Sequence, residues 1–370
     1  MCSFLEWLYP DYALLEQGTG RFPVVVFPAP TEQQCDVDSV LGDLVLSAKE
    51  REDLVVNDSK YLRLARAAGA SDRYLWNGQT YVVECLTLEP RLQLECRLGW
   101  YFDTLRSCDI LEWELLAELG KRRWHRQNFE RLANRLPLRR RLHDVVPDPI
   151  VSGHGRSAAL AGSTLVVFND GTGLRVFLRQ RSSRVAVHAQ LYHVVPSFMI
   201  QPFTPSIEKE YSVIHNVLRE FGEELFDIKE LERDRGYGGY VAFDWFYEAP
   251  PVKELRDLLA TGEAQLLLTG VAVNLLNLRP EVCTLLLILT PEWYRVHSKD
   301  IKSRGLLCYN WEVADAAELA RTRQVGLAPP PVFGPYGDLL SYWNVAPPGA
   351  AAYYLGLGVA ADTLVAKGIT

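Results

Sequence analysis

The sequence lacks the features that mark several large classes of protein. Cysteine is sparse, since seven cysteines are scattered over 370 residues and no C-x-x-C pair occurs. Such a set argues against a disulfide framework or a structural zinc site and favours reduced, buried thiols. A basic excess is also missing, because 39 Lys and Arg stand against 46 Asp and Glu, for a net charge of -7. That balance argues against a protein that coats nucleic acid non-specifically.

No membrane-spanning or targeting segment is predicted. No apolar run reaches the ~20 residues that cross a bilayer, and the first six residues do not form a basic region followed by an apolar stretch. We therefore expect a cytoplasmic protein without a membrane partner. Hydrophobic residues make up 48% of the chain, which is enough for a packed core. The length predicts two domains, or one large α/β or α+β domain.

Residues 1–150 are expected to form an α+β region whose role the sequence does not reveal. Strand-like runs cover residues 22–28, 41–46 and 80–88. Between residues 99 and 119 apolar side chains recur at helical spacing, which predicts one or two amphipathic helices. Prolines at 137, 147 and 149 then interrupt the pattern, so we place a domain boundary near residue 150.

A basic segment from Lys121 to Arg141 holds nine Lys or Arg residues, with Trp124 and Phe129 among them. One interpretation is a basic helix that contacts nucleic acid or an acidic partner. The favoured interpretation is a solvated basic face, or one with an intramolecular partner, because the segment also has leucines to bury and the whole chain is acidic.

Residues 151–330 are predicted to form a second domain that begins with a β-hairpin. Two β-rich runs, 163–168 and 174–181, flank the turn Asn169-Asp170-Gly171. A strand at 191–195 leads to Pro196, and a helix is expected over about 207–225. Further on we expect a helical stretch at 252–263, strands at 266–273 and 283–289, and a closing helix at 311–320. Residues 331–370 are expected to be an extension that packs on this domain and ends in an Ala-rich helix from about Pro347.

The most informative stretch is the string from Arg219 to Glu224 on the expected helix. Side chains three and four residues apart share a helix face, so Glu220 and Glu224 project together, with Glu223 beside them and in reach of Arg219. A solvated helix face is the plain explanation of such a pattern. The glutamates interleave with an apolar stripe, however, which places part of the cluster at the edge of the core. Crowded carboxylates at such an edge favour a hard cation such as Mg²⁺, which is often held by one or two carboxylates plus substrate phosphates.

The order of these segments resembles the Nudix hydrolase superfamily. A hairpin that ends at residues 180–182 and a strand that leads to Pro196 precede a helix with the string Arg-Glu-Phe-Gly-Glu-Glu at 219–224. The family signature has a glycine, a glutamate six residues on and, after seven more, R-E-U-x-E-E-x-G-U with U apolar. Residues 219–224 match the central part of that string, whereas Phe226 and Asp227 replace its final glycine and apolar residue.

The loop half of the motif differs from the signature. Tyr211 stands where the signature has its first glutamate, with Glu208 and Glu210 as near substitutes. Residues 196–198, Pro-Ser-Phe, occupy the place of the usual Pro-Gly-Gly, and the loop before Arg219 is some seven residues longer. The resemblance covers about residues 160–320, and the chain also looks like a divergent group of bacterial Nudix-like proteins with extra N-terminal sequence.

The resemblance implies a mixed sheet packed between helices and a metal held by the helix. Glu220, Glu223 and Glu224 would be ligands to Mg²⁺ or Mn²⁺, and Arg219 would orient Glu223 or a neighbour through a charge-assisted hydrogen bond. The implied reaction is hydrolysis of a nucleoside diphosphate linked to another moiety, by water attacking phosphorus.

Further side chains are candidates for the same site. Glu281, at the start of a strand, is a candidate general base or additional ligand, with an exposed loop carboxylate as the alternative. Arg179 and Arg181 are candidates to contact diphosphate oxygens, with ordinary ion pairing as the alternative. His193 and His215 are candidates to reach the site, although a histidine beside apolar residues is more often structural.

Two functions from different classes remain open. The retained glutamates favour a metal-dependent hydrolase, whereas the altered loop favours a non-catalytic Nudix-like domain that binds a nucleotide and transmits its occupancy, as a sensor or regulator. A third interpretation makes the basic segment a nucleic-acid reader. The sequence leaves the oligomeric state open, and a homodimer is among the possible assemblies.

Overall fold

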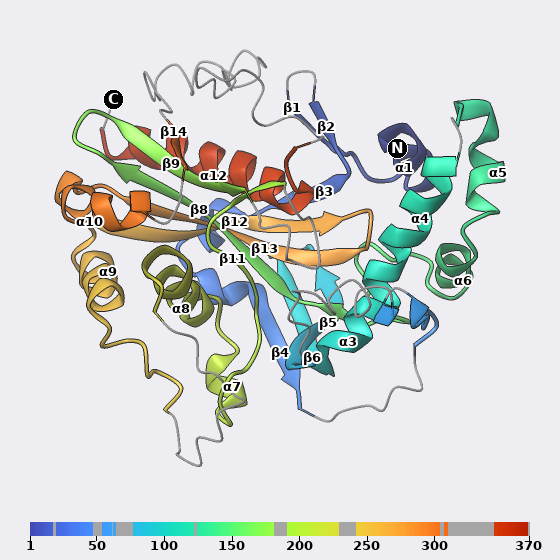
Figure 1. Ribbon diagram of the computed structural model, residues 1–370, viewed down its shortest axis with the longest axis horizontal. Helices are drawn as coiled ribbons and strands as arrows, with labels where there is room; N and C mark the ends of the chain where they lie inside the picture. The colour runs from blue at the N-terminus through green and yellow to red at the C-terminus, as the bar shows by residue number, and fades with distance from the viewer. Residues whose placement is uncertain are drawn as a thin grey trace.

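The computed structural model combines helices with mixed sheets, so the predicted α+β class is confirmed. Figure 1 shows a large sheet at the centre of the molecule, with helices on both sides of it. The structure describes residues 1–17, 20–46, 54–60, 62–63, 77–121, 124–180, 191–228, 242–303, 307–309 and 344–368. The expected closing helix at 311–320 lies outside these residues.

The large sheet has eight strands and mixed topology. Its order is β10-β9-β8-β13-β12-β3, with β11 paired to β8 and β14 to β9. β13 runs parallel to β8, and all other pairs are antiparallel. The strands are β3 (Val24–Pro28), β8 (Ala161–Asn169), β9 (Leu174–Gln180), β10 (Tyr192–Val194), β11 (Ser197–Met199), β12 (Ala264–Asn274), β13 (Arg279–Ile288) and β14 (Leu307–Tyr309).

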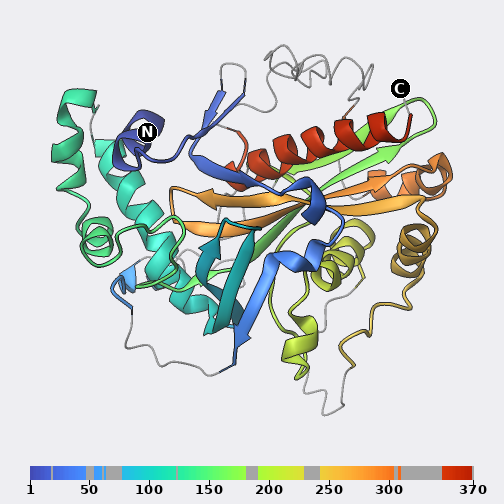
Figure 2. The same ribbon diagram turned by 180° about the vertical axis from the view of Figure 1, so that it is seen from behind.

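Helices cover both faces of this sheet. α12 (Pro347–Ala366) lies on one face, and α8 (Val213–Phe226), α9 (Pro250–Thr261) and α10 (Pro291–Ser303) lie on the other, as Figures 1 and 2 show from opposite sides. Leu165 and Val167 of β8 pack with α12, whereas the alternate residues Val166 and Phe168 belong to the core beneath α8. This double cover explains why β8, β12 and β13 are almost continuously apolar rather than alternating.

α12 is long and apolar because it is a core helix of this arrangement. Its 20 residues make it the one helix in the described part of the chain that is apolar enough, by length and composition, to cross a membrane. A helix was expected from about Pro347, but the expectation that no apolar run is long enough to cross a bilayer did not count it. In the structure 61% of its apolar window is buried, and the helix contacts β3, β8, β12 and β13. A sheet face this apolar accounts for the composition of the helix.

A second sheet lies beside the first, in the order β4-β6-β5-β7. Its strands are β4 (Leu41–Val45), β5 (Gln79–Thr87), β6 (Gln93–Trp100) and β7 (Ala158–Ala159), and a separate hairpin joins β1 (Leu15–Gln17) to β2 (Gly20–Phe22). β6 was missed in the sequence, where helical spacing was assigned from residue 99. Residues 93–100 form a strand, and they alternate between buried and accessible positions as strand residues do. The helix begins only after them, at Tyr101.

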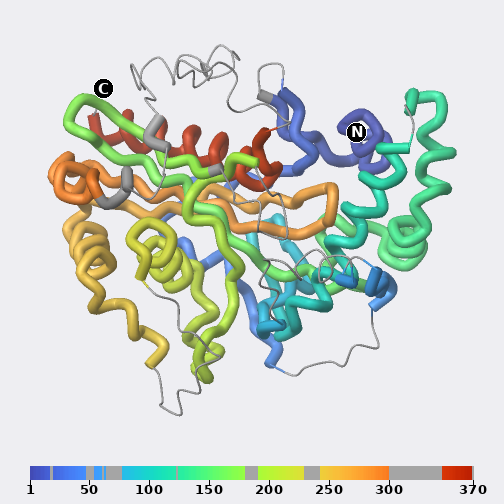
Figure 3. The backbone as a smooth tube through the Cα atoms, viewed as in Figure 1, coloured from blue at the N-terminus to red at the C-terminus, as the bar shows by residue number. Residues whose placement is uncertain are grey.

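Helices of the N-terminal region stand at one end of the molecule, followed easily in the tube of Figure 3. They are α1 (Cys2–Leu8), α3 (Tyr101–Thr104), the π-helix η4 (Leu105–Asp109), α4 (Ile110–Lys121), α5 (Phe129–Ala133) and α6 (Pro137–Val145), with the short 3-10 helix η5 (Arg126–Asn128). Two further 3-10 helices, η1 (Thr31–Gln33) and η2 (Val37–Val40), follow β3 near the centre of the molecule, where η2 contacts α8. The basic segment is therefore not one helix. It spans the end of α4, η5, α5 and α6, and Pro137 begins the last of these.

Part of the basic segment has an intramolecular partner. Arg139 is only 1% exposed and donates hydrogen bonds to the Tyr9 hydroxyl at 2.6 Å and to the carbonyls of Leu275 and Leu276. Arg140 and Arg141 remain exposed. Arg139 thus ties α6 to the turn between β12 and β13.

The two sides of the predicted boundary near residue 150 interlock. β3, from the N-terminal region, is the outermost strand beside β12 in the large sheet, and β7, from beyond the boundary, pairs with β5 in the small one. The close approach of β3 needs a glycine, because a Cβ on Gly270 would lie 2.3 Å from the Phe27 carbonyl oxygen. The C-terminal extension packs on the large sheet through α12.

Candidate functional site

The helix that carries the acidic string is α8, and its first turn is fixed by a side chain from far away in the sequence. The predicted helix over 207–225 is in fact two helices, α7 (Ile207–Glu210) and α8, because Ser212 adopts an extended conformation and caps α8 by accepting from the His215 amide. Asp38 of η2 accepts hydrogen bonds from the amides of Val213 at 2.6 Å and Ile214 at 3.1 Å. A carboxylate here satisfies otherwise unpaired amides and complements the helix dipole.

Arg219 is almost fully buried on α8. Its side chain is 2% exposed, and Nη2 donates to Glu220 Oε1 at 2.8 Å and to Asn216 Oδ1 at 3.1 Å. The guanidinium lies 3.7 Å from the ring centre of Phe203, a cation–π contact. Nε and Nη1 are buried without a hydrogen-bond partner among the described residues. Arg219 was expected to orient Glu223 or a neighbour, and the contact described here is with the neighbour Glu220.

The three glutamates of the string line one side of α8 as expected. Glu220, Glu223 and Glu224 are all partly buried, and the side chain of Glu220 is only 12% exposed. The opposite side carries Phe221 and Leu225, which belong to the core. The carboxylates thus sit at the edge of the apolar stripe and not on a fully solvated face.

α8 packs closely on α9 because Gly222 has no side chain. A Cβ there would lie 2.7 Å from Ile228 Cδ1 and 2.9 Å from Val252 Cγ2. The helix ends at Asp227, whose φ of 57° and ψ of 33° are left-handed, a conformation that Asp tolerates better than most residues. The helix end thus has its left-handed residue at 227, one position after the glycine of the family signature.

Glu281 is not brought together with these glutamates. It lies on β13, buried at 8% exposure, and accepts a hydrogen bond from Ser163 Oγ of β8. Cys283 and Leu285, which share its side of the strand, pack with α12, whereas Val282 packs in the core beneath α8. The register between β13 and β8 is unbroken from Glu281 onward. Strand alternation therefore directs Glu281 to the opposite face of the sheet from α8.

The other candidate substrate-binding residues lie on the β9 and β10 edge. Arg179 and His193 are register partners across these strands; Arg179 is exposed and His193 is 3% exposed. His193 packs against the start of α12, where a Cβ on Gly349 would lie 3.0 Å from its Cγ. Arg181 lies outside the described residues.

His215 is a structural residue within an aromatic cluster. Its ring lies against Phe243 and Phe246, and Nδ1 is 3.2 Å from the Tyr247 hydroxyl. Burial, assisted by the positive charge of Arg219, lowers the pKa of His215 to about 4. The side chain is therefore neutral at physiological pH and faces away from the carboxylate row.

The loop before α8 is held by a glutamate that the sequence offered only as a near substitute. Glu210 is 1% exposed and accepts hydrogen bonds from the amides of Phe203 and Thr204, both at 2.7 Å. Phe203, which stacks on Arg219, is thereby fixed in place. Tyr211 packs on Tyr81 and donates to the Leu94 carbonyl at 3.2 Å. Neither Asp38 nor Phe203 could be found from spacing, because both reach α8 through tertiary contacts.

The donor atoms suit a hard cation, but they do not form a ready-made cage. Carboxylate oxygens are the ligands that Mg²⁺ and Mn²⁺ prefer. Within the described ranges, no three His, Cys, Asp or Glu side chains are grouped closely enough to hold a metal ion. The carboxylates of Glu220, Glu223 and Glu224 are thus of the right chemical type for such an ion, and their role as ligands stays a prediction.

Comparison with known proteins does not assign the chain to a family. No family model matches it, and no curated protein has a significantly similar sequence. The resemblance of residues 219–224 to the Nudix motif therefore stays a prediction.

Proposed function

We propose that the protein is a divalent-metal-dependent hydrolase that cleaves a nucleoside diphosphate linked to another moiety. The observation that carries the proposal is the row of partly buried carboxylates on α8, on a helix fixed at both ends and braced by a buried arginine. Such rigidity is what a catalytic constellation requires, because a displacement of 1 Å is enough to reduce the rate strongly.

The residues of α8 would have distinct roles in this reaction. Glu223 and Glu224 would hold Mg²⁺ or Mn²⁺, and Arg219 would fix the side chain of Glu220 beside them. When bound, the cation would neutralise the charge of the diphosphate and lower the pKa of the attacking water. Glu210 and Phe203 hold the loop that covers Arg219 and so exclude water from its guanidinium.

The same geometry also supports a second candidate, binding of the nucleotide without turnover. Two observations favour it: Glu220 is already engaged by Arg219, and Glu281 is directed to the far side of the sheet. In that case the domain would act as a sensor or regulator whose occupancy reaches the N-terminal region through the contact of Asp38 with α8.

Turnover measurements on the full chain test both candidates. Purified protein is incubated with ADP-ribose and other nucleoside diphosphate derivatives in Mg²⁺ or Mn²⁺, and product formation is compared for the wild type, Glu223→Gln and the control Glu32→Gln, whose glutamate is exposed and lies outside the candidate site. We expect Glu223→Gln to lower kcat at least about 100-fold and the control to keep it. Undiminished turnover in Glu223→Gln refutes the metal role, whereas tight binding without turnover in the wild type supports the sensor.

A further inference from the structure

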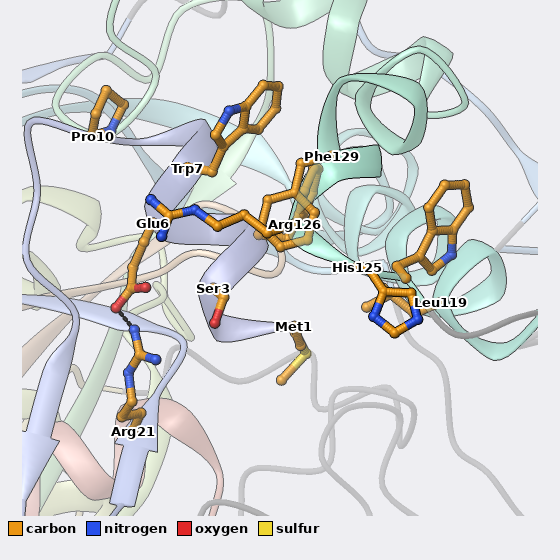
Figure 4. A pocket seen from close by; sticks show the side chains of 12 residues that line it. Met1, Ser3, Glu6, Trp7, Pro10, Arg21, Leu119, His125, Arg126 and Phe129 are labelled. Carbon is orange, nitrogen blue, oxygen red and sulfur yellow. Dashed lines mark ion pairs between the residues drawn. The ribbon is translucent and has the colours of Figure 1, made fainter.

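The N-terminal region contains a large open cavity that is separate from α8. Its volume is about 950 Å³, and it lies between α1, the end of α4 and the segment of η5 and α5. Figure 4 shows side chains from these elements converging on it. This volume is at the upper end of the range for small-molecule sites, ~300–1,000 Å³. Its lining, within the described part of the chain, comes from the first 129 residues.

One wall of the cavity is aromatic and has an exposed indole. Trp7 is 41% exposed, and its ring stacks on that of Phe4, with 5.9 Å between the ring centroids and an interplanar angle of 25°. Phe129 supports both rings, at 5.5 Å from Phe4 and 6.1 Å from Trp7. Because Phe4 and Phe129 are buried, they hold Trp7 in place while part of its surface stays open. A supported, partly exposed indole is a platform on which another aromatic ring can stack.

The remaining charge in the cavity is positive. Among the described lining residues Glu6 carries the one acidic side chain, and it is ion-paired with Arg21. Arg126 is exposed and makes no ion pair with any residue that the structure describes. Figure 4 shows its side chain extending across the cavity toward Trp7. His125 lies next to it on the rim. An unpaired guanidinium beside an aromatic platform suits a planar ring that carries an anionic group.

We infer that this cavity binds an aromatic anion of the size of a mononucleotide, with its ring on Trp7 and its phosphate at Arg126. The inference is independent of the chemistry proposed for α8. It gives the N-terminal region a ligand of its own, and it gives the basic segment a local role: Arg126 recognises a phosphate, while Arg139 is a buried structural residue.

Calorimetric titration of the full chain with AMP tests the inference. Trp7→Leu keeps an apolar side chain against Phe4 and Phe129 but removes the platform, and Arg126→Gln removes the charge. Each is expected to weaken AMP binding at least about 10-fold. Trp100→Leu is the matched control, since Trp100 is 40% exposed and lies outside the cavity; it should bind AMP as the wild type does.

Two fragments of the probe separate the contributions. Adenosine binding should respond to Trp7→Leu and not to Arg126→Gln, and ribose 5-phosphate should show the reverse. The inference is overturned if AMP does not bind at millimolar concentration, or if Trp7→Leu binds it as tightly as Trp100→Leu does. It is also overturned if AMP binding is lost in Glu223→Gln and kept in Trp7→Leu, because the ligand then sits at α8. Binding of a single-stranded oligonucleotide far more tightly than AMP would replace it with the nucleic-acid interpretation.

Discussion

Replacement of Asp38 by alanine is the sharpest test of how α8 is held. The carboxylate accepts from two amides of the first turn and from the Ser212 hydroxyl at 2.7 Å. Loss of a capping side chain costs ~1 kcal/mol, up to ~2, and loss of a negative charge at a helix N-terminus costs a further ~0.3–1 kcal/mol. We therefore expect Asp38→Ala to destabilise the first turn of α8 by about 2 kcal/mol, or about 30-fold in its opening equilibrium.

Hydrogen exchange measures this directly at the two amides that Asp38 accepts from. The exchange of Val213 and Ile214 should accelerate by about that factor, with a parallel fall in the free energy of unfolding in urea. Asp38→Asn keeps a hydrogen-bond acceptor but loses the charge, so it should destabilise the first turn of α8 by roughly half as much as Asp38→Ala does. Asp36→Ala is the control, because Asp36 is exposed on the same segment and caps η2 without a side-chain hydrogen bond. If the Val213 and Ile214 amides exchange at the same rate in Asp38→Ala as in Asp36→Ala, Asp38 does not stabilise the first turn of α8.

Three further predictions concern packing and protonation. Gly222→Ala should destabilise the protein by about 1–3 kcal/mol, because its methyl would crowd Ile228 and Val252; a neutral result in urea unfolding would contradict the close contact with α9. Gly120→Ala in α4 should instead stabilise the protein by about 0.5–1 kcal/mol, since nothing lies within 4 Å of the added methyl. A lower free energy of unfolding in urea than that of the wild type would contradict this prediction. His215, with a pKa lowered from 6.5 to about 4, keeps its full contribution to stability above pH 6.5 and should lose ~3 kcal/mol as the pH falls to 4. His215→Phe should flatten this part of the wild-type profile, and an unchanged slope would exclude the residue as its source.

Local pattern was enough to predict much of the fold. The hairpin of β8 and β9 was identified from the Asn169-Asp170-Gly171 turn between two β-rich runs, and α12 was expected from about Pro347. Both signals depend on residues close in sequence. β6 was missed because it runs directly into a helix, so that some of its apolar residues also fit the helical period. The break at Ser212 was missed because the first turn of α8 is held by Asp38 of η2.

In the candidate site, too, the sequence predicted the features that depend on local spacing and missed those that depend on tertiary contacts. The row of glutamates on α8 follows from helical geometry, so the sequence predicted it. The direction of Glu281 depends on which face of the sheet α8 covers, and no spacing in the sequence contains that information. The cavity around Trp7 was also missed, since it forms where α1 meets η5 and α5, which are more than a hundred residues apart in the chain.

The place of β3 has a consequence for any attempt to divide the protein. β3 covers the outer edge of β12 over five register pairs, from Gly270 to Asn274. A fragment that starts near residue 150 would leave this edge, one of the most apolar segments of the chain, with unpaired amides and carbonyls. Exposed strands of this kind recruit other chains and aggregate. The C-terminal part should therefore be recovered in soluble form only when residues 24–28 are supplied with it, covalently or as a peptide.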